Sequence, residues 1–147
     1  MQQIMRNKIG LKYIIPVFIV IILVILSHRQ GPYHDGIYEG KSRARYVQEP
    51  YVGFVRIEIF KGHLAKIDFK IVDTLNNEIF DGNYEKHYTG NQTYIEQCRH
   101  DWKGVQEYPI RLLETQNIER VDAVSGATWS YNIFKQSALI ALKNASD

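Results

Sequence analysis

The sequence contains little of what several common protein classes require. Its 147 residues include a single cysteine, Cys98, which excludes a disulfide-rich scaffold. It has no Cys-x-x-Cys-His segment for covalent haem, no Walker A sequence and no GxGxxG segment after a predicted strand. The five histidines lack the spacing of metal ligands, and no nucleophile, base and acid form a recognisable set. We therefore expect no metal site and no catalytic residue, and a buried apolar place for Cys98, with a reactive thiol as the alternative.

The charge balance gives no support for a nucleic-acid-binding protein. The net charge is +2, but residues 1–30 hold four of the 18 basic residues and no acidic one. The remainder carries 14 basic against 16 acidic side chains, so the basic character belongs to the N-terminal segment. With 45% hydrophobic residues the chain is too apolar for intrinsic disorder, and its length suits one domain with its own core.

An apolar segment near the N-terminus predicts a transmembrane anchor. Residues 9–27 are nineteen residues long and contain an uncharged run over residues 13–26, which together suffice to span a bilayer. A cleaved signal peptide is the alternative, but no pair of small residues suited to processing follows the run. The positive-inside rule keeps residues 1–8 in the cytoplasm. We therefore expect a single-pass protein of the cell membrane, with a linker over residues 28–35 and an extracytoplasmic domain over residues 36–147.

Alternating polarity predicts an antiparallel sheet in this domain. A glycine-interrupted strand is expected over residues 36–44. In residues 53–60 and 65–71 apolar residues alternate with charged ones on both sides of a Lys61-Gly62 turn. This pattern predicts a hairpin with one buried face.

Helical spacing of apolar residues predicts that helices cover the sheet. One helix is expected over residues 92–103 and another over residues 129–144, whereas residues 108–115 fit either a short helix or a strand. The expected fold class is α+β: an N-terminal transmembrane helix followed by a small domain with an antiparallel sheet packed against helices.

Residues 122–130 (DAVSGATWS) place small residues and hydroxyl groups where the last predicted helix begins. Free backbone N–H groups at a helix N-terminus favour a phosphate or another anion. Gly126 and Ala127 would let a ligand approach the backbone closely. Hydroxyl and carboxylate groups are also ordinary helix caps, so the spacing leaves an anion site and a helix cap as alternatives. The polar side chains concerned are those of Asp122, Ser125, Thr128 and Ser130.

The same residues resemble the flavinylation motif of the FMN-binding domain family. In that motif an Asp is followed by two or three residues, a Ser or Thr, and then Gly-Ala-Thr. The family includes the extracytoplasmic flavin subunits of sodium-pumping NADH:quinone reductase and of Rnf complexes. Residues 35–40 (DGIYEG) resemble the family's opening strand, and the hairpin and the last helix follow in the same order, whereas residues 74–118 depart from the pattern.

The resemblance implies that FMN is attached to Thr128 through a phosphoester. A Mg-dependent flavin transferase on the extracytoplasmic side would use FAD as donor and release AMP. Asp122, Ser125 and Gly126 would be recognised mainly by this transferase. Trp129 is a candidate for stacking on the isoalloxazine ring, with a place in the core as the alternative.

The function implied is electron relay by a flavoprotein anchored in the lipid bilayer. Its expected partners are the flavin transferase and membrane redox proteins, such as the subunits of a quinone-reductase-type complex. One alternative is a module that binds FMN or another phosphorylated ligand noncovalently. Others are a structural subunit of a membrane complex without redox function, and a self-contained reductase, for which the sequence shows no substrate site.

Overall fold

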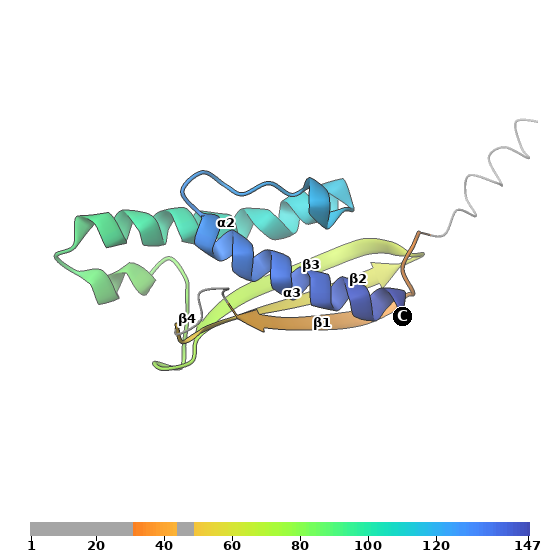
Figure 1. Ribbon diagram of the computed structural model, residues 1–147, viewed down its shortest axis with the longest axis horizontal. Helices are drawn as coiled ribbons and strands as arrows, with labels where there is room; N and C mark the ends of the chain where they lie inside the picture. Colours follow the sequence, from red (N-terminus) through yellow and green to blue (C-terminus); the bar gives the residue numbers. More distant parts are fainter. Residues whose placement is uncertain (1–30, 44–48) are drawn as a thin grey trace, which may run out of the picture. The chain divides into compact units, whose positions relative to one another are not determined.

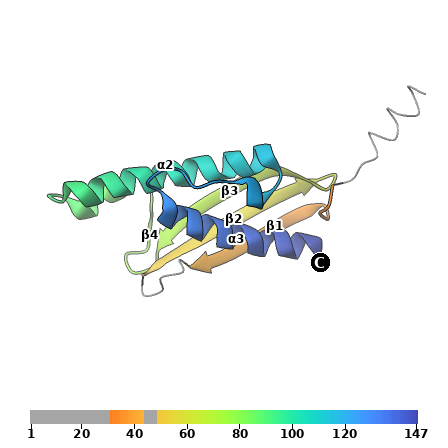
Figure 2. The ribbon, with the colours of Figure 1, turned by 45° about the horizontal axis from the view of Figure 1, so that its top comes forward.

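The computed structural model describes residues 31–43 and 49–147, in which two long helices lie on one face of a four-stranded antiparallel sheet (Figure 1). The strands follow one another in the sheet in chain order. Figure 2 shows both long helices over the same face, with α3 along the β1–β2 side and α2 along β3. The elements are β1 (Gly36–Arg43), β2 (Tyr51–Phe60), β3 (His63–Asp73), β4 (Glu78–Ile79), η1 (Tyr84–Tyr88), α2 (Gln92–Thr115), η2 (Ile118–Arg120) and α3 (Thr128–Ser146).

The expected fold class is wrong in one respect, the transmembrane helix. Within residues 31–43 and 49–147, no helix combines the length and the apolar character needed to cross a bilayer. The helices α2 and α3 have 24 and 19 residues, but each buries one side against the sheet and presents polar side chains on the other. The span expected over residues 9–27 lies outside the described residues, as do the cytoplasmic segment expected over residues 1–8 and the first residues of the expected linker.

The hairpin of β2 and β3 forms at the predicted Lys61-Gly62 turn, where both residues have positive φ. The predicted alternation of β3 is wrong at its first position, because Ala65 is exposed and Leu64 is buried instead. The pairing register shifts at this point: Glu58 pairs with Lys66, whereas the next residue of β2 pairs with Leu64. Ala65 is thus the extra residue of a β-bulge, which reverses the inward and outward positions before the turn.

A single helix, α2, replaces the two separate segments expected over residues 92–103 and 108–115. Its buried residues recur at intervals of three and four, which is a helical stripe that runs past Pro109 without interruption. Proline inside a helix costs about 3 kcal/mol through a lost hydrogen bond and a steric clash. Burial of the stripe against the sheet offsets this cost. The sequence of a short segment does not reveal this burial. The stripe comprises Cys98, Asp101, Val105, Tyr108 and Leu112.

The helix α3 lies directly on the sheet because β1 has a glycine beneath it. A Cβ atom added to Gly40 would lie 1.9 Å from the carbonyl oxygen of Ser137. The predicted inner face of α3 is buried, including Phe134 and Ala138. This close packing fixes the position of the helix, and therefore of its N-terminus at Thr128.

Candidate functional site

The loop of residues 121–127 enters α3 and is held by polar side chains of α2. Tyr108 donates its hydroxyl proton to the carbonyl oxygen of Ala127 (2.8 Å) and accepts a hydrogen bond from the amide of Val124 (3.2 Å). Farther along α2, the guanidinium group of Arg111 donates to the carbonyl oxygen of Asp122 (3.2 Å). The backbone of the loop is therefore fixed, whereas its polar side chains remain available.

The earlier part of α2 holds the glycine turn of the same loop. The side-chain amide of Gln97 donates to the carbonyl oxygen of Gly126 (2.7 Å), and Nδ1 of His100 lies within hydrogen-bond distance of the carbonyl oxygen of Ser125 (3.2 Å). Gly126 has a φ of +78°, and a Cβ atom there would lie 2.7 Å from Nδ1 of His100. Glycine is thus required both by the left-handed backbone and by the imidazole ring that packs on it.

The N-terminus of α3 is capped by an acid from another helix. The N-cap residue is Ala127, and its own side chain makes no capping hydrogen bond. Instead, Oδ1 of the buried Asp101 accepts hydrogen bonds from the amide (3.1 Å) and the hydroxyl (2.8 Å) of Ser130. Among the described residues, the amides of Thr128 and Trp129 have no acceptor, as is usual for the first turn of a helix. The hydroxyls that the sequence offered as local caps therefore do not cap the helix.

The predicted site residues separate into exposed and buried groups. Asp122, Ser125, Gly126 and Thr128 are exposed, so an enzyme acting on this segment can reach them. Ala127 and Ser130 are fully buried. The small size of Ala127 is thus explained by packing under the loop, and the hydroxyl of Ser130 by its bond to Asp101.

An aromatic groove of about 250 Å³ begins beside the first turn of α3. Trp129, the residue after Thr128, forms part of its wall, and its indole N–H donates to Glu49 (2.6 Å). The indole contacts the ring of Tyr51 edge-on, with ring centroids 5.0 Å apart, and that of Phe80 at 5.3 Å. Trp129 is half-buried, so it belongs both to the core and to the groove. The remaining lining residues are Tyr88, Tyr94, Gln97, Cys98 and Asp101.

A chain of hydroxyl groups runs from the groove into the core. The hydroxyl of Tyr51 lies 3.0 Å from that of Tyr84 and 3.4 Å from that of Tyr88. Tyr84 in turn donates to Oδ2 of the buried Asp73 (2.5 Å). Burial opposes ionisation of Asp73, but hydrogen bonds from Tyr84, from the side chain of Asn76 and from two backbone amides hold its pKa below its usual value. Asp73 is therefore a carboxylate at neutral pH.

The thiol of Cys98 lies in the wall of the groove and is buried, as expected. Burial, followed by the charges of Asp101 and Glu85, raises the pKa of this thiol to about 11. At neutral pH the group is therefore a thiol and not a thiolate, which makes it an apolar wall and a poor nucleophile.

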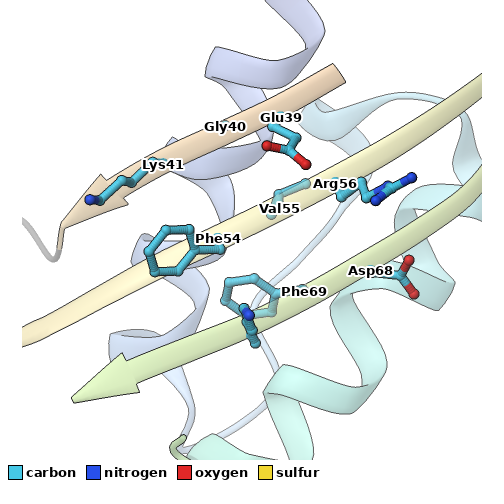
Figure 3. Close-up of a pocket in the computed structure, with 9 residues that line it drawn as sticks. Glu39, Gly40, Lys41, Phe54, Val55, Arg56, Asp68 and Phe69 are labelled. Atoms are coloured by element: carbon cyan, nitrogen blue, oxygen red, sulfur yellow. The ribbon is translucent and has the colours of Figure 1, made fainter. Parts of the chain in front are cut away.

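A larger hollow, of about 540 Å³, lies on the opposite face of the sheet, which α2 and α3 leave uncovered (Figure 3). Lys41, Phe54 and Lys70 stand side by side across three strands. The two ammonium groups lie 5.2 Å and 5.7 Å from the centroid of the Phe54 ring. None of residues 122–130 lines this hollow, and in Figure 3 the helices lie behind the sheet. We therefore place the candidate site at the aromatic groove, which is lined by Trp129, the residue after Thr128.

Most groups of the aromatic groove and of the α3 cap come from a segment to which the sequence patterns assign no function. The expected resemblance breaks off over residues 74–118, yet this segment supplies Asp101, Gln97 and most of the aromatic wall. One signal was present in the sequence: Asp101 interrupts an otherwise mostly apolar helical stripe. An acidic side chain at a buried position needs hydrogen-bond donors, and here they belong to Ser130 and Gln97.

Comparison with known proteins shows a fold likeness but no family. No family model matches the chain, and no curated protein matches it. The crystal structure of CPE2226 protein from Clostridium perfringens, a structural genomics target, is 25% identical with a TM-score of 0.56, over 77% of this chain and 88% of that one. A protein from Clostridium thermocellum, solved by NMR, is 22% identical with a TM-score of 0.46, over 77% of this chain and 92% of that one. The arrangement of sheet and helices therefore recurs in CPE2226, and neither protein is described by a ligand or an activity.

Proposed function

We propose that this protein is an extracytoplasmic electron-relay flavoprotein that carries FMN on Thr128. The observation that carries the proposal is the position of this residue. Thr128 is exposed, it is the first residue of α3, and the next residue forms the wall of an aromatic groove. The resemblance of residues 122–130 to a flavinylation motif gives this threonine its chemistry.

The attachment reaction balances as a transfer of FMN from FAD. The Thr128 oxygen attacks the phosphorus atom of the FMN half, and the phosphoanhydride P–O bond breaks. A phosphoester P–O bond to Thr128 forms, AMP leaves, and the hydroxyl proton is released. A Mg-dependent flavin transferase supplies the metal ion and the catalytic groups, and this chain supplies the acceptor hydroxyl.

The surroundings of Thr128 fit a phosphodiester. The amides of Thr128 and Trp129 are unpaired within the described residues, and they stand at the positive end of the α3 dipole. Such a placement stabilises an anion by about 0.3–1 kcal/mol when exposed. The third amide, that of Ser130, already binds the carboxylate of Asp101. A phosphate held only by ionic contacts and hydrogen bonds would have to overcome this negative charge, whereas a covalent link holds the phosphate without depending on such contacts.

The groove fits an aromatic ring that is tethered at its rim. Tyr51, Phe80, Tyr88, Tyr94 and Trp129 supply apolar and aromatic surface, as in most sites for planar ligands. When bound, a flavin accepts two electrons and can release them one at a time, which is the chemistry that an electron relay needs. The protein would orient the ring toward its redox partners, of which subunits of a quinone-reductase-type complex are the class that we propose.

The decisive experiment is intact-mass analysis of the full chain after co-expression with a flavin transferase. The wild-type chain and Thr128→Ser should gain one FMN-derived mass and flavin absorption bands, whereas Thr128→Ala should gain neither. Thr93→Ala is a matched control, since it removes an exposed threonine hydroxyl from the first turn of α2, outside residues 122–130. Flavin that dissociates on denaturation would instead support noncovalent binding, and a colourless, unmodified wild-type chain would favour a structural subunit.

A further inference from the structure

The aromatic groove has a polar lining whose hydrogen-bonding direction follows from the contacts. A carboxylate only accepts hydrogen bonds, so the Tyr84 hydroxyl must donate its single proton to Asp73. In the contact between Tyr51 and Tyr84, Tyr51 is then the donor. In the contact between Tyr51 and Tyr88, Tyr88 is the donor for the same reason. Every proton of the chain points inward, toward Asp73.

The outer end of this chain therefore presents lone pairs to the groove. Tyr51 and Tyr88 both line the groove, and both have committed their protons to other tyrosines. The pKa shifts agree with these directions of donation. Burial, followed by donation to Tyr84, raises the pKa of Tyr51, and donation to Tyr51 raises the pKa of Tyr88. Burial, then donation to Asp73, raises the pKa of Tyr84 to about 12. None of these hydroxyls ionises at neutral pH, so the direction of the chain persists.

Apart from the Tyr94 hydroxyl, which can donate or accept, and the weakly donating thiol of Cys98, the other polar groups of the groove present acceptors as well. The side-chain amide of Gln97 donates both to Asp101 (2.7 Å) and to the carbonyl oxygen of Gly126 (2.7 Å), which leaves its oxygen as the free atom. The side-chain oxygens of Asp101 accept hydrogen bonds from Gln97 and from Ser130. The indole N–H of Trp129 is already bound to Glu49. A planar ligand in this groove thus meets mostly oxygen lone pairs, which only N–H or O–H groups of the ligand can match.

We propose that Asp73, acting through Tyr84, Tyr51 and Tyr88, fixes the groove as a hydrogen-bond acceptor that favours the reduced flavin ring over the oxidised ring. This inference rests on the proposed function for the identity of the ring. A reduced isoalloxazine carries N–H groups at two positions where the oxidised ring has bare nitrogen lone pairs. At these two positions the neutral reduced ring can donate to the lining, whereas the oxidised ring sets lone pair against lone pair. Asp73 is a positioning residue, and Tyr88 is the terminal acceptor.

The test is the midpoint potential of the flavinylated full chain and of its Tyr88→Phe variant. Loss of the terminal acceptor should reduce the preference for the reduced ring about three- to tenfold, which lowers the two-electron potential by about 15–30 mV. The charges of Asp101 and Glu49 are the same in both proteins and cancel in the comparison. Tyr38→Phe is the matched control, since it removes a tyrosine hydroxyl on β1, outside the groove. Equal potentials for Tyr88→Phe and Tyr38→Phe would overturn the inference.

A second measurement needs no covalent flavin. In the Thr128→Ala background, oxidised and dithionite-reduced riboflavin are titrated anaerobically against protein tryptophan fluorescence. Adding Tyr88→Phe should lower the ratio of the affinity for reduced riboflavin to that for oxidised riboflavin by the same three- to tenfold. Asp73→Asn should also lower this affinity ratio, provided that thermal melting shows the variant to be folded. The side-chain amide of asparagine can donate to Tyr84, which would reverse the direction of the hydrogen bonds between the tyrosines. An unchanged ratio in Tyr88→Phe refutes the inference, whereas failure of the transferase to modify wild-type protein refutes only the proposed function.

Discussion

Replacement of Asp101 by alanine tests how the N-terminus of α3 is held. The variant removes the only side-chain acceptor of the Ser130 amide within the described residues, together with the partner of Gln97. The Ser130 hydroxyl keeps a second acceptor, the carbonyl oxygen of Ala127 (3.2 Å), so the main loss is the charge-assisted bond to a buried amide. Such a bond contributes about 1.5–3 kcal/mol, and the favourable position of the charge at a helix N-terminus adds about 0.3–1 kcal/mol. We therefore expect the free energy of unfolding to fall by about 2–4 kcal/mol.

Urea denaturation of the full chain, followed by far-UV circular dichroism, measures this loss. With a denaturant slope of about 2 kcal/mol/M, the midpoint should fall by about 1–2 M. Glu114→Ala is the matched control, because it removes an equal charge from an exposed position of the same helix. Its expected change is within about 0.5 kcal/mol. The reasoning is refuted if the two variants have the same midpoint, since the cap would then contribute no more than a surface charge.

Two further predictions concern the sheet and its buried acid. Gly40→Ala should destabilise the protein by about 1–3 kcal/mol, seen as a lower melting temperature, because the added Cβ would lie 1.9 Å from the backbone oxygen of Ser137 and α3 would have to move; an unchanged melting temperature would contradict the close packing. For Asp73, whose folded pKa lies below its unfolded value, the stabilisation is complete above about pH 4 and is lost as the pH falls through the folded pKa. Urea midpoints measured between pH 7 and pH 2.5 should therefore fall more steeply for wild-type protein than for Asp73→Asn, and parallel curves would show that Asp73 does not contribute.

The elements predicted most accurately from local patterns are those whose sequence pattern agrees with their surroundings in the fold. The β2–β3 hairpin has a period of two residues and a glycine turn, and α3 has a clear apolar face, so both appear close to the expected bounds. The prediction failed at Ala65 and in dividing α2 into separate segments over residues 92–103 and 108–115. A β-bulge depends on pairing with the opposite strand, and the tolerance of α2 for proline depends on the core beneath it. Neither partner is visible in a short stretch of sequence.

The sequence alone singled out the segment to which we assign the chemistry, because a run of small and hydroxyl residues before an amphipathic helix is a local property of the chain. Only the tertiary structure decided which of these groups are exposed and what surrounds them. Thr128 is exposed, Ser130 is buried on Asp101, and the groove is assembled from residues between positions 49 and 129. The physical reason is that side-chain burial and hydrogen-bond direction are set by groups that the fold brings together, such as Asp73 beneath Tyr84. These groups lie apart in the sequence, so their contacts exist only once the sheet and α2 have packed together.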